Sequence, residues 1–304
     1  MATSNGIQRR IQARALAAIF LVLGFVSLLA PSRLAARPAQ ASTELTAIQY
    51  SSDSTTMIDA YIARPAGAAK SPAVILVHDD LGANKRFQEM ARQFADAGFV
   101  VLLPNLASRS RKSALEPTDG LQPRVTPVSG LSASDTLQDV EAAFAFLKQD
   151  SEVDASKISA VGVGWGAFRV WRLAEDTPTL FRAVVFYGVT PYDQDQLRTI
   201  RVPVLAHYAE QDYLITVTAL KTKQLLGAKF TYHIYPTVPG FLGGGTGALM
   251  SQQSGTGQFF SMDGTTPEVR EAAAKQAWTR TLEFLRVTAP ATTASKASAE
   301  THQK

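Results

Sequence analysis

One stretch of this chain constrains its fold more than any other. Residues 158–167 read Ile-Ser-Ala-Val-Gly-Val-Gly-Trp-Gly-Ala, an apolar run that ends in alternating glycines and passes directly into a helical pattern. A strand that turns sharply into a helix is the setting in which hydrolytic enzymes expose a serine in a G-x-S-x-G frame. Gly164 occupies the middle of that frame here. The sequence therefore predicts the turn without its nucleophile.

The segments around this turn alternate between strand and helix patterns. Apolar runs predict buried strands at residues 73–78, 99–103, 158–163, 183–187, 202–208 and 229–235. Helical spacing of apolar residues predicts helices at 84–97, 134–148, 165–174, 216–226 and 266–285. Residues 46–51 and 57–62 alternate apolar and polar residues, as in an exposed antiparallel pair. The pattern indicates the α/β class, with a mostly parallel sheet and helices on both faces.

The first 41 residues predict a targeting segment. Residues 1–14 contain arginine and no acid, residues 15–30 are apolar, and Ala39-Gln40-Ala41 fits a small-x-small cleavage site. This order is typical of a secretory signal peptide. The alternative is an uncleaved N-terminal anchor, although the apolar run is shorter than the roughly 20 residues of a spanning helix. We expect an exported protein, periplasmic or extracellular, that touches a membrane only if residues 15–30 remain attached.

Charge and cysteine content exclude several function classes. The five arginines of residues 1–41 turn the net charge of +4 into −1 when that segment is removed. The short basic patch at residues 109–112 is interpreted as a solvated loop, so we expect no nucleic-acid partner. The chain has no cysteine, which excludes disulfides and a thiol nucleophile. No metal-ligand spacing is present, and we expect neither a metal nor another cofactor.

Several stretches, taken in order, resemble the dienelactone hydrolase family of α/β-hydrolases. The resemblance covers roughly residues 73–285. It rests on Val77-His-Asp-Asp-Leu-Gly82, Gly98-Phe-Val-Val-Leu-Leu-Pro104, Val161-Gly-Val-Gly-Trp-Gly166, Phe186-Tyr-Gly188, His207-Tyr-Ala-Glu-Gln-Asp212 and Tyr235-Pro-Thr-Val-Pro-Gly-Phe241. It implies an α/β-hydrolase fold for residues 42–287 and a carboxylic-ester or lactone hydrolase ancestry. Residues 288–304 are rich in Ala, Thr and Ser and are expected to form a disordered tail.

The resemblance also implies where a catalytic triad would lie. Family members use a nucleophile, an acid and a base in that chain order, because the nucleophile needs a base and the base needs a carboxylate that orients it. The matching positions in this chain are Gly164, Asp212 and Pro239. Only Asp212 can serve in a triad, so the resemblance implies that the nucleophile and the base are absent.

Further residues are placed at the mouth of the pocket by the same resemblance. The N–H of Trp165 and one N–H of the Asp79-Asp80-Leu81 loop would form an oxyanion hole. Asp79 stands where many members carry Glu near the nucleophile, and a loop-capping role is the alternative. The Trp165 ring either packs above Gly164 or stacks on a ligand. His78 is expected to shape the pocket mouth, and a surrogate base at this position is the alternative.

No other residue is predicted to replace the missing pair. The remaining histidines are His207, His233 and His302, and none lies between Pro239 and the end of the last helix. The serines Ser151, Ser159 and Ser254 do not lie on a strand-to-helix turn. The glycine spacing also differs from the G-x-G-x-x-G of dinucleotide binding, and the loop at 243–247 lacks the Lys-Ser/Thr of a phosphate loop.

These observations lead to one function hypothesis and two alternatives. The hypothesis is an exported α/β-hydrolase-domain protein without nucleophile and base, which binds a small carboxylate or ester-like ligand, or a protein partner, at the old pocket. The first alternative is an active carboxylic-ester or lactone hydrolase with an atypical site, such as water activated by His78. The second is a structural accessory subunit held at a membrane by residues 15–30.

Overall fold

The computed structural model describes residues 43–67, 70–110, 128, 130–188, 190–210, 212, 217–236 and 266–286. All of them belong to a unit that begins at Thr43. The proposed targeting segment, the tail, the loop at 243–247, Pro239, Ser254 and His302 lie outside the described residues. In the part of the chain that is described, no helix is both long and apolar enough to cross a membrane.

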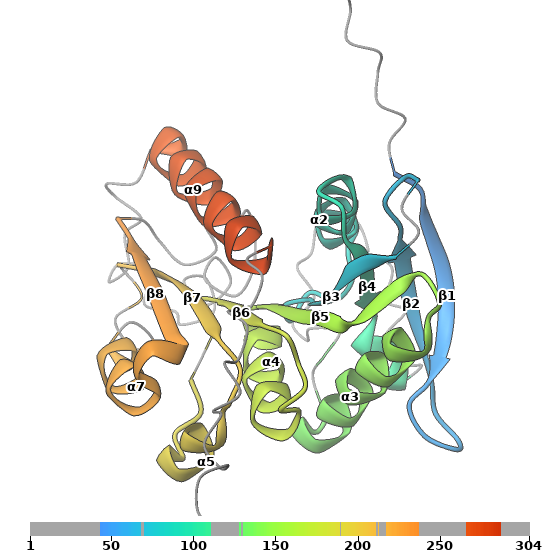
Figure 1. The fold of residues 1–304 in the computed structure, drawn as a ribbon, viewed down its shortest axis with the longest axis horizontal. Coiled ribbons are helices and arrows are strands. Elements are labelled where there is room, and N and C mark those ends of the chain that lie inside the picture. The colour runs from blue at the N-terminus through green and yellow to red at the C-terminus, as the bar shows by residue number, and fades with distance from the viewer. Residues whose placement is uncertain are drawn as a thin grey trace, which may run out of the picture. The chain divides into compact units, whose positions relative to one another are not determined.

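The centre of the fold is an eight-stranded sheet with the order β1-β2-β4-β3-β5-β6-β7-β8 (Figure 1). Its strands are β1 (Leu45–Ser51), β2 (Met57–Ala63), β3 (Ser71–Val77), β4 (Val100–Pro104), β5 (Val153–Val163), β6 (Ala183–Phe186), β7 (Val204–Ala209) and β8 (Phe230–Tyr235). The β1–β2 and β2–β4 pairs are antiparallel, and the pairs from β4 through β8 are parallel. The predicted α/β class, with its antiparallel edge pair, is therefore confirmed.

Helices cover both faces of this sheet (Figure 1). One face carries α2 (Lys85–Asp96) and α9 (Pro267–Arg286), and the other carries α3 (Ala133–Gln149), α4 (Trp165–Asp176), α5 (Gln194–Thr199) and α7 (Thr218–Leu226). Each layer has its own apolar cluster against the sheet. The sequence did not predict the short α5 or the 3-10 segments η1 (Leu106–Ser110) and η2 (Gly227–Lys229). It also placed the start of β5 at residue 158, whereas the strand begins at Val153 and pairs with β3 across an irregularity at Ser71.

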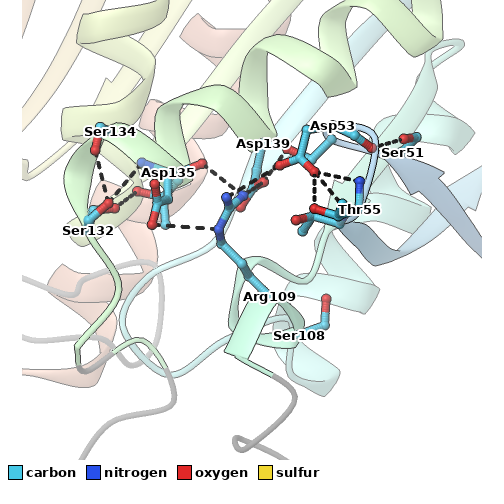
Figure 2. A network of polar contacts seen from close by, with 12 residues as sticks. Ser51, Asp53, Thr55, Ser108, Arg109, Ser132, Ser134, Asp135 and Asp139 are labelled. Atoms are coloured by element: carbon cyan, nitrogen blue, oxygen red, sulfur yellow. Dashed lines mark hydrogen bonds and ion pairs between the residues drawn. The ribbon is translucent and has the colours of Figure 1, made fainter.

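A polar network ties the β1–β2 turn to α3 through one arginine (Figure 2). Arg109 Nη1 lies 2.5 Å from Asp139 Oδ1, while Asp53 Oδ2 and Asp135 Oδ2 lie 3.7 and 3.8 Å from the same guanidinium. Ser52 Oγ donates a second hydrogen bond to Asp139 Oδ1, at 2.5 Å. The interpretation of Arg109 as part of a solvated loop is therefore wrong: its side chain keeps only 16% of its accessible surface. A sequence window could not show this, because the acids come from two other elements.

Candidate active site

The sharp turn predicted from the sequence lies between β5 and α4. Val163 ends the strand, Trp165 begins the helix, and Gly164 between them has φ 55° and ψ −114°. A residue with a side chain is strained there by about 1–3 kcal/mol, and glycine is not. The Gly164 N–H donates to Phe186 O at 2.9 Å, which joins the turn to β6. We call residues 163–165 the elbow.

The glycines around the elbow are required by close packing. A Cβ on Gly162 would lie 2.7 Å from both Gly166 O and Ala167 Cα, and one on Gly166 would lie 2.5 Å from Val77 O. A Cβ on Gly188 would lie 2.8 Å from Gly164 O. Such distances are far inside van der Waals contact. The first turn of α4 therefore lies directly against the ends of its neighbouring strands. Close packing explains the glycine spacing, and a bound nucleotide is not needed to explain it.

His78, at the end of β3, is fully buried and both of its ring nitrogens are occupied. Its Nε2 accepts a hydrogen bond from the Leu106 N–H at 3.1 Å, so the ring proton must lie on Nδ1. That Nδ1–H donates to Asp79 O at 2.6 Å. Burial, and to a smaller extent the charge of Arg169, lowers the pKa of His78 to about 4. His78 is thus a neutral residue that fixes the loop after β3, and it has no free lone pair to act as a base.

His207, on β7, is likewise held by two hydroxyl groups. Tyr235 Oη and Thr281 Oγ1 each lie 3.0 Å from one of its ring nitrogens. Its ring stacks on Phe186, with centroids 4.6 Å apart. Burial lowers the pKa of His207 well below its ordinary value, and the charges of His233 and Arg280 act in the same direction. This histidine joins α9 to the sheet and is not available as a base either.

Asp79 forms a buried ion pair on the loop after β3. Its Oδ2 lies 2.9 Å from Arg86 Nη2, and its Oδ1 accepts the Leu81 N–H at 2.9 Å. Burial raises the pKa of Asp79 despite the nearby Arg86. Burial raises the pKa of the nearby Tyr187 hydroxyl, and the charge of Arg86 opposes that rise. The capping role expected as one alternative for Asp79 is present, and the Leu81 N–H is no longer free to join an oxyanion hole.

Asp80 differs sharply from its neighbour. It is 8% exposed, and its Oδ1 is buried with no hydrogen-bond partner within the described ranges. Burial and the adjacent charge of Asp79 raise the pKa of Asp80 to about 6. This carboxyl group can therefore hold or release a proton near neutral pH, two residues after His78, whose ring stacks on Trp165 of the elbow.

We expect the Asp80→Asn variant to stabilise the fold in a pH-dependent way. Because folding raises this pKa from 3.8 to about 6, the folded chain binds a proton that the unfolded chain has released between these pH values. Stability therefore falls as the pH rises through this interval and stays low above it. Asparagine removes the effect, so unfolding followed by circular dichroism should show a gain of roughly 1–2 kcal/mol at pH 8 and almost none at pH 4.

The control for this prediction is Asp154→Asn on β5. Hydrogen bonds from Ser156 and Lys157 lower the pKa of Asp154, so its ionised form favours folding. The asparagine variant should therefore be less stable than the parent at pH 8 and equal to it well below pH 4. Equal effects of the two substitutions at pH 8 would contradict the environment described for Asp80.

The Trp165 ring, at the start of α4, contacts the ring of His78 and the guanidinium of Arg169. The indole is parallel to the ring of His78, with centroids 6.0 Å apart and an interplanar angle of 7°. The Arg169 guanidinium lies 3.4 Å from the centre of the indole. The side chain is partly buried against the core, which agrees with packing as its main role. As the first residue of α4, Trp165 has no intrahelical acceptor for its own N–H, so its oxyanion-hole role stays a prediction.

Asp212 follows β7 at the same carboxyl edge of the sheet as the elbow. Its N–H donates to Ala209 O at 3.0 Å, and its charge is one of the influences on the buried Tyr208 hydroxyl, whose pKa burial raises to about 12. β7 is separated from β5 by β6 alone. Pro239 lies outside the described residues, so the triad assignment as a whole stays a prediction. Ser159 is buried within β5 opposite Val74, and Ser151 lies exposed before that strand, which excludes both from the elbow.

Three residues near the elbow were missed by the sequence reasoning: Arg86, Arg169 and Tyr187. Arg169 lies one helical turn after Trp165, a spacing that predicts contact but not burial. Tyr187 has φ 35°, which is rare outside glycine, and no local sequence signal announces it. A groove of about 400 Å³ lies farther along α4, where Phe168 and Arg172 face Tyr192. It is not over Gly164.

The chemistry open to this site is limited. The elbow offers no hydroxyl or thiol. The buried histidines His78 and His207 are neutral, and hydrogen bonds occupy both ring nitrogens of each. Within the described residues, no group of three or more His, Asp or Glu is arranged to hold a metal ion. Among the described residues, what remains is a protonatable carboxyl at Asp80, the carboxyl of Asp212, the backbone N–H of Trp165 and the buried cation of Arg169.

Comparison with known proteins points to one family. The model of the "Dienelactone hydrolase family" matches residues 58–289. A Bradyrhizobium protein named as a probable 2-oxo-3-(5-oxofuran-2-ylidene)propanoate lactonase is 28% identical over 75% of this chain and 88% of its own length. A putative carboxymethylenebutenolidase of Methylorubrum extorquens is 26% identical over 54% of this chain and 59% of its own.

Solved structures agree on the fold. A putative dienelactone hydrolase from Klebsiella pneumoniae has a TM-score of 0.61 at 20% identity, covering 80% of this chain and 98% of that protein. A dienelactone hydrolase-like promiscuous phosphotriesterase, P91, from metagenomic libraries has a TM-score of 0.58 at 19% identity, with the same coverage. At these identities the likeness supports the α/β-hydrolase fold alone.

Proposed function

Because this chain belongs to the dienelactone hydrolase family, we propose that it binds an ester, lactone or carboxylate ligand at the elbow without forming an acyl-enzyme. The observation that carries the proposal is Gly164. Its backbone has the turn geometry that would present a nucleophile, and the residue has no side chain. Both buried histidines near the sheet edge, His78 and His207, are occupied by structural hydrogen bonds.

The loss of turnover that is expected without a nucleophile and a base supports ligand binding over covalent catalysis. Removing the nucleophile or the base of a serine hydrolase lowers turnover by about 10⁶, leaving roughly 10³–10⁴ over water. The proposed ligand class follows from the relatives, which are named as a lactonase and as carboxymethylenebutenolidases. The N–H at the start of α4 can also donate a hydrogen bond to a polarised carbonyl oxygen or to a carboxylate oxygen.

A burst assay tests the proposal. Purified protein mixed with 4-nitrophenyl acetate should release no burst of nitrophenolate and should turn over at the background rate. Gly164→Ser combined with Pro239→His should raise turnover at least about tenfold, because the frame that orients a nucleophile is present. A wild-type burst, or a kcat in the ordinary enzyme range of about 1–10³ s⁻¹, would overturn the proposal.

A second candidate is hydrolysis by activated water, and Asp80 favours it. Its buried carboxylate has an oxygen without a hydrogen-bond partner among the residues that the structure describes. In this route the carboxylate takes a proton from water while the water oxygen bonds to the ester carbonyl carbon. The carbon–oxygen bond to the leaving group then breaks, and the leaving oxygen receives the proton. Steady turnover without a burst that is lost in Asp80→Asn would establish this candidate in place of the first.

Export is also part of the proposal. The support is the arginine-containing, apolar and small-residue order of residues 1–41. The N-terminal residue of the native protein tests it: a chain beginning near Ser42 supports a secreted form. A chain that retains residues 15–30 supports the accessory role at a membrane.

A further inference from the structure

Arg169 carries a buried positive charge that no acid among the described residues compensates. It is 7% exposed. Its Nε donates to Thr136 Oγ1 at 3.2 Å and its Nη1 donates to Trp165 O at 3.1 Å. No carboxylate in the described part of the chain pairs with it, and burial alone lowers the pKa of Arg169 to about 10. Buried charges in proteins are normally paired.

Three partly buried arginines show the normal arrangement, whereas Arg182, which is also 7% exposed, lies over the rings of Phe181 and Phe284. Arg86 pairs with Asp79 at 2.9 Å, Arg109 pairs with Asp139, and Arg172 pairs with Glu175. Arg169 instead stacks on the Trp165 ring at 3.4 Å. A cation–π contact offsets only part of the desolvation of a guanidinium. Of the two arginines that are buried among the described residues, Arg169 is the one that contacts the elbow, through the Trp165 ring.

The geometry leaves Arg169 able to accept a ligand. A guanidinium has five N–H donors in a planar fork, and the contacts of Arg169 within the described residues use two of them. The remaining donors suit two oxygens of one anionic group, which such a fork binds in a bidentate manner. The charge reaches the elbow: it is one of the causes that lower the pKa of His78, whose ring lies parallel to Trp165.

We propose that Arg169 is the anion-recognition residue of this protein, and that the ligand entering the elbow carries an oxyanion, either a carboxylate or a phosphate monoester. The inference depends on the proposed function only for placing the ligand at the elbow. It holds whether the ligand is bound unchanged or hydrolysed by water. Arg169 supplies charge and orientation, and takes no part in bond breaking.

Calorimetric titration of the full chain with matched probes tests this assignment. Benzoate, phenyl phosphate and the neutral benzamide have one ring each and differ in the head group. Wild-type protein should bind at least one of the two anions about tenfold or more tightly than benzamide, in line with a charge-assisted bidentate pair. The stronger of the two anions identifies the head group. Equal affinity for all three probes would overturn the proposal.

Variants assign the effect to this residue. Arg169→Gln should lose the preference for the anion and keep the affinity for benzamide, and Arg169→Lys should retain part of the preference, because it keeps the charge without the fork. The control is Arg172→Gln, whose side chain is occupied by Glu175, and it should bind like wild type. Unchanged anion binding in folded Arg169→Gln would show that the cation only packs on Trp165. If the glutamine variant does not fold, the lysine variant decides: full affinity would overturn the assignment.

Indole fluorescence places the anion independently. Binding beside Arg169 should change the fluorescence emission of Trp165, so the response should vanish in Trp165→Phe. It should persist in Trp278→Phe, because Trp278 packs on Phe94 at the other face of the sheet. A response that persists in Trp165→Phe would locate the anion elsewhere. Ester turnover by the wild-type protein would refute non-covalent binding as the function. The comparison of anion and benzamide affinities would still test the role of Arg169.

Discussion

Gly166→Ala is expected to destabilise the fold by about 3 kcal/mol or more, because the added methyl group has nowhere to go. Its Cβ would lie 2.5 Å from Val77 O and would overlap His78 O as well. Both are backbone atoms at the end of β3, and no flexible side chain can move to make room. Relief requires α4 to move away from β3, which breaks the elbow. Urea unfolding measures the loss directly, and the melting temperature should fall by roughly 6–12 °C.

Gly98→Ala is the matched control for this substitution. A Cβ at Gly98 meets nothing within 4 Å, and its φ of +99° is the only obstacle. The expected loss is about 1 kcal/mol, from backbone strain alone. If Gly166→Ala unfolds at the same urea concentration as Gly98→Ala, the close approach of α4 to β3 is not real.

Arg109→Met should lower the free energy of unfolding by about 3 kcal/mol at neutral pH, because it leaves a buried carboxylate without its counter-ion. Asp139 is fully buried, its Oδ2 has no partner in the described residues, and burial raises its pKa even beside Arg109 (Figure 2). In the variant only the Ser52 hydroxyl would still contact the carboxylate oxygen that Arg109 holds. The deficit should shrink as the pH falls toward 4, because a protonated Asp139 needs no counter-ion.

The control for the arginine is a similar pair on the surface. Arg92 Nη1 lies 3.5 Å from Glu89 Oε2, and the glutamate side chain is more than half exposed. Arg92→Met should change stability by no more than about 0.5 kcal/mol. Equal effects at the two positions in thermal melts would show that the network at Arg109 does not hold the β1–β2 turn to α3.

Much of the fold could be predicted from local patterns. The uninterrupted apolar run at 73–77 predicts a strand covered on both faces, and β3 lies near the middle of the sheet. Alternation at 46–51 predicts an edge strand, and β1 is one. The crossed order, in which β4 lies between β2 and β3, could not be predicted. It depends on how the connections pack against the sheet, and strand composition carries no record of that.

The candidate site was predicted less completely than the fold. The glycine frame locates the elbow, because its spacing is local and steric. Arg109 was misinterpreted, and Arg86, Arg169 and Tyr187 were missed. Each acts through residues from other elements: Arg109 through the β1–β2 turn and α3, and Arg169 through Thr136 on α3. A sequence window shows that an arginine is present, and its partner decides whether it is a surface charge or part of a site.

By itself, the sequence determined which side chains this protein can use: position 164 has none, and no histidine lies between residue 239 and the end of the last helix. Residue identity does not change on folding, so that limit holds in any conformation. Only the tertiary structure decided which groups are charged and free to act. His78 is neutral because folding buries its ring, and an N–H 28 residues away occupies the Nε2 lone pair. Arg169 keeps an uncompensated charge because folding buried it away from every described acid. Protonation and pairing depend on distances between segments remote in the chain, and these exist only once the chain has folded.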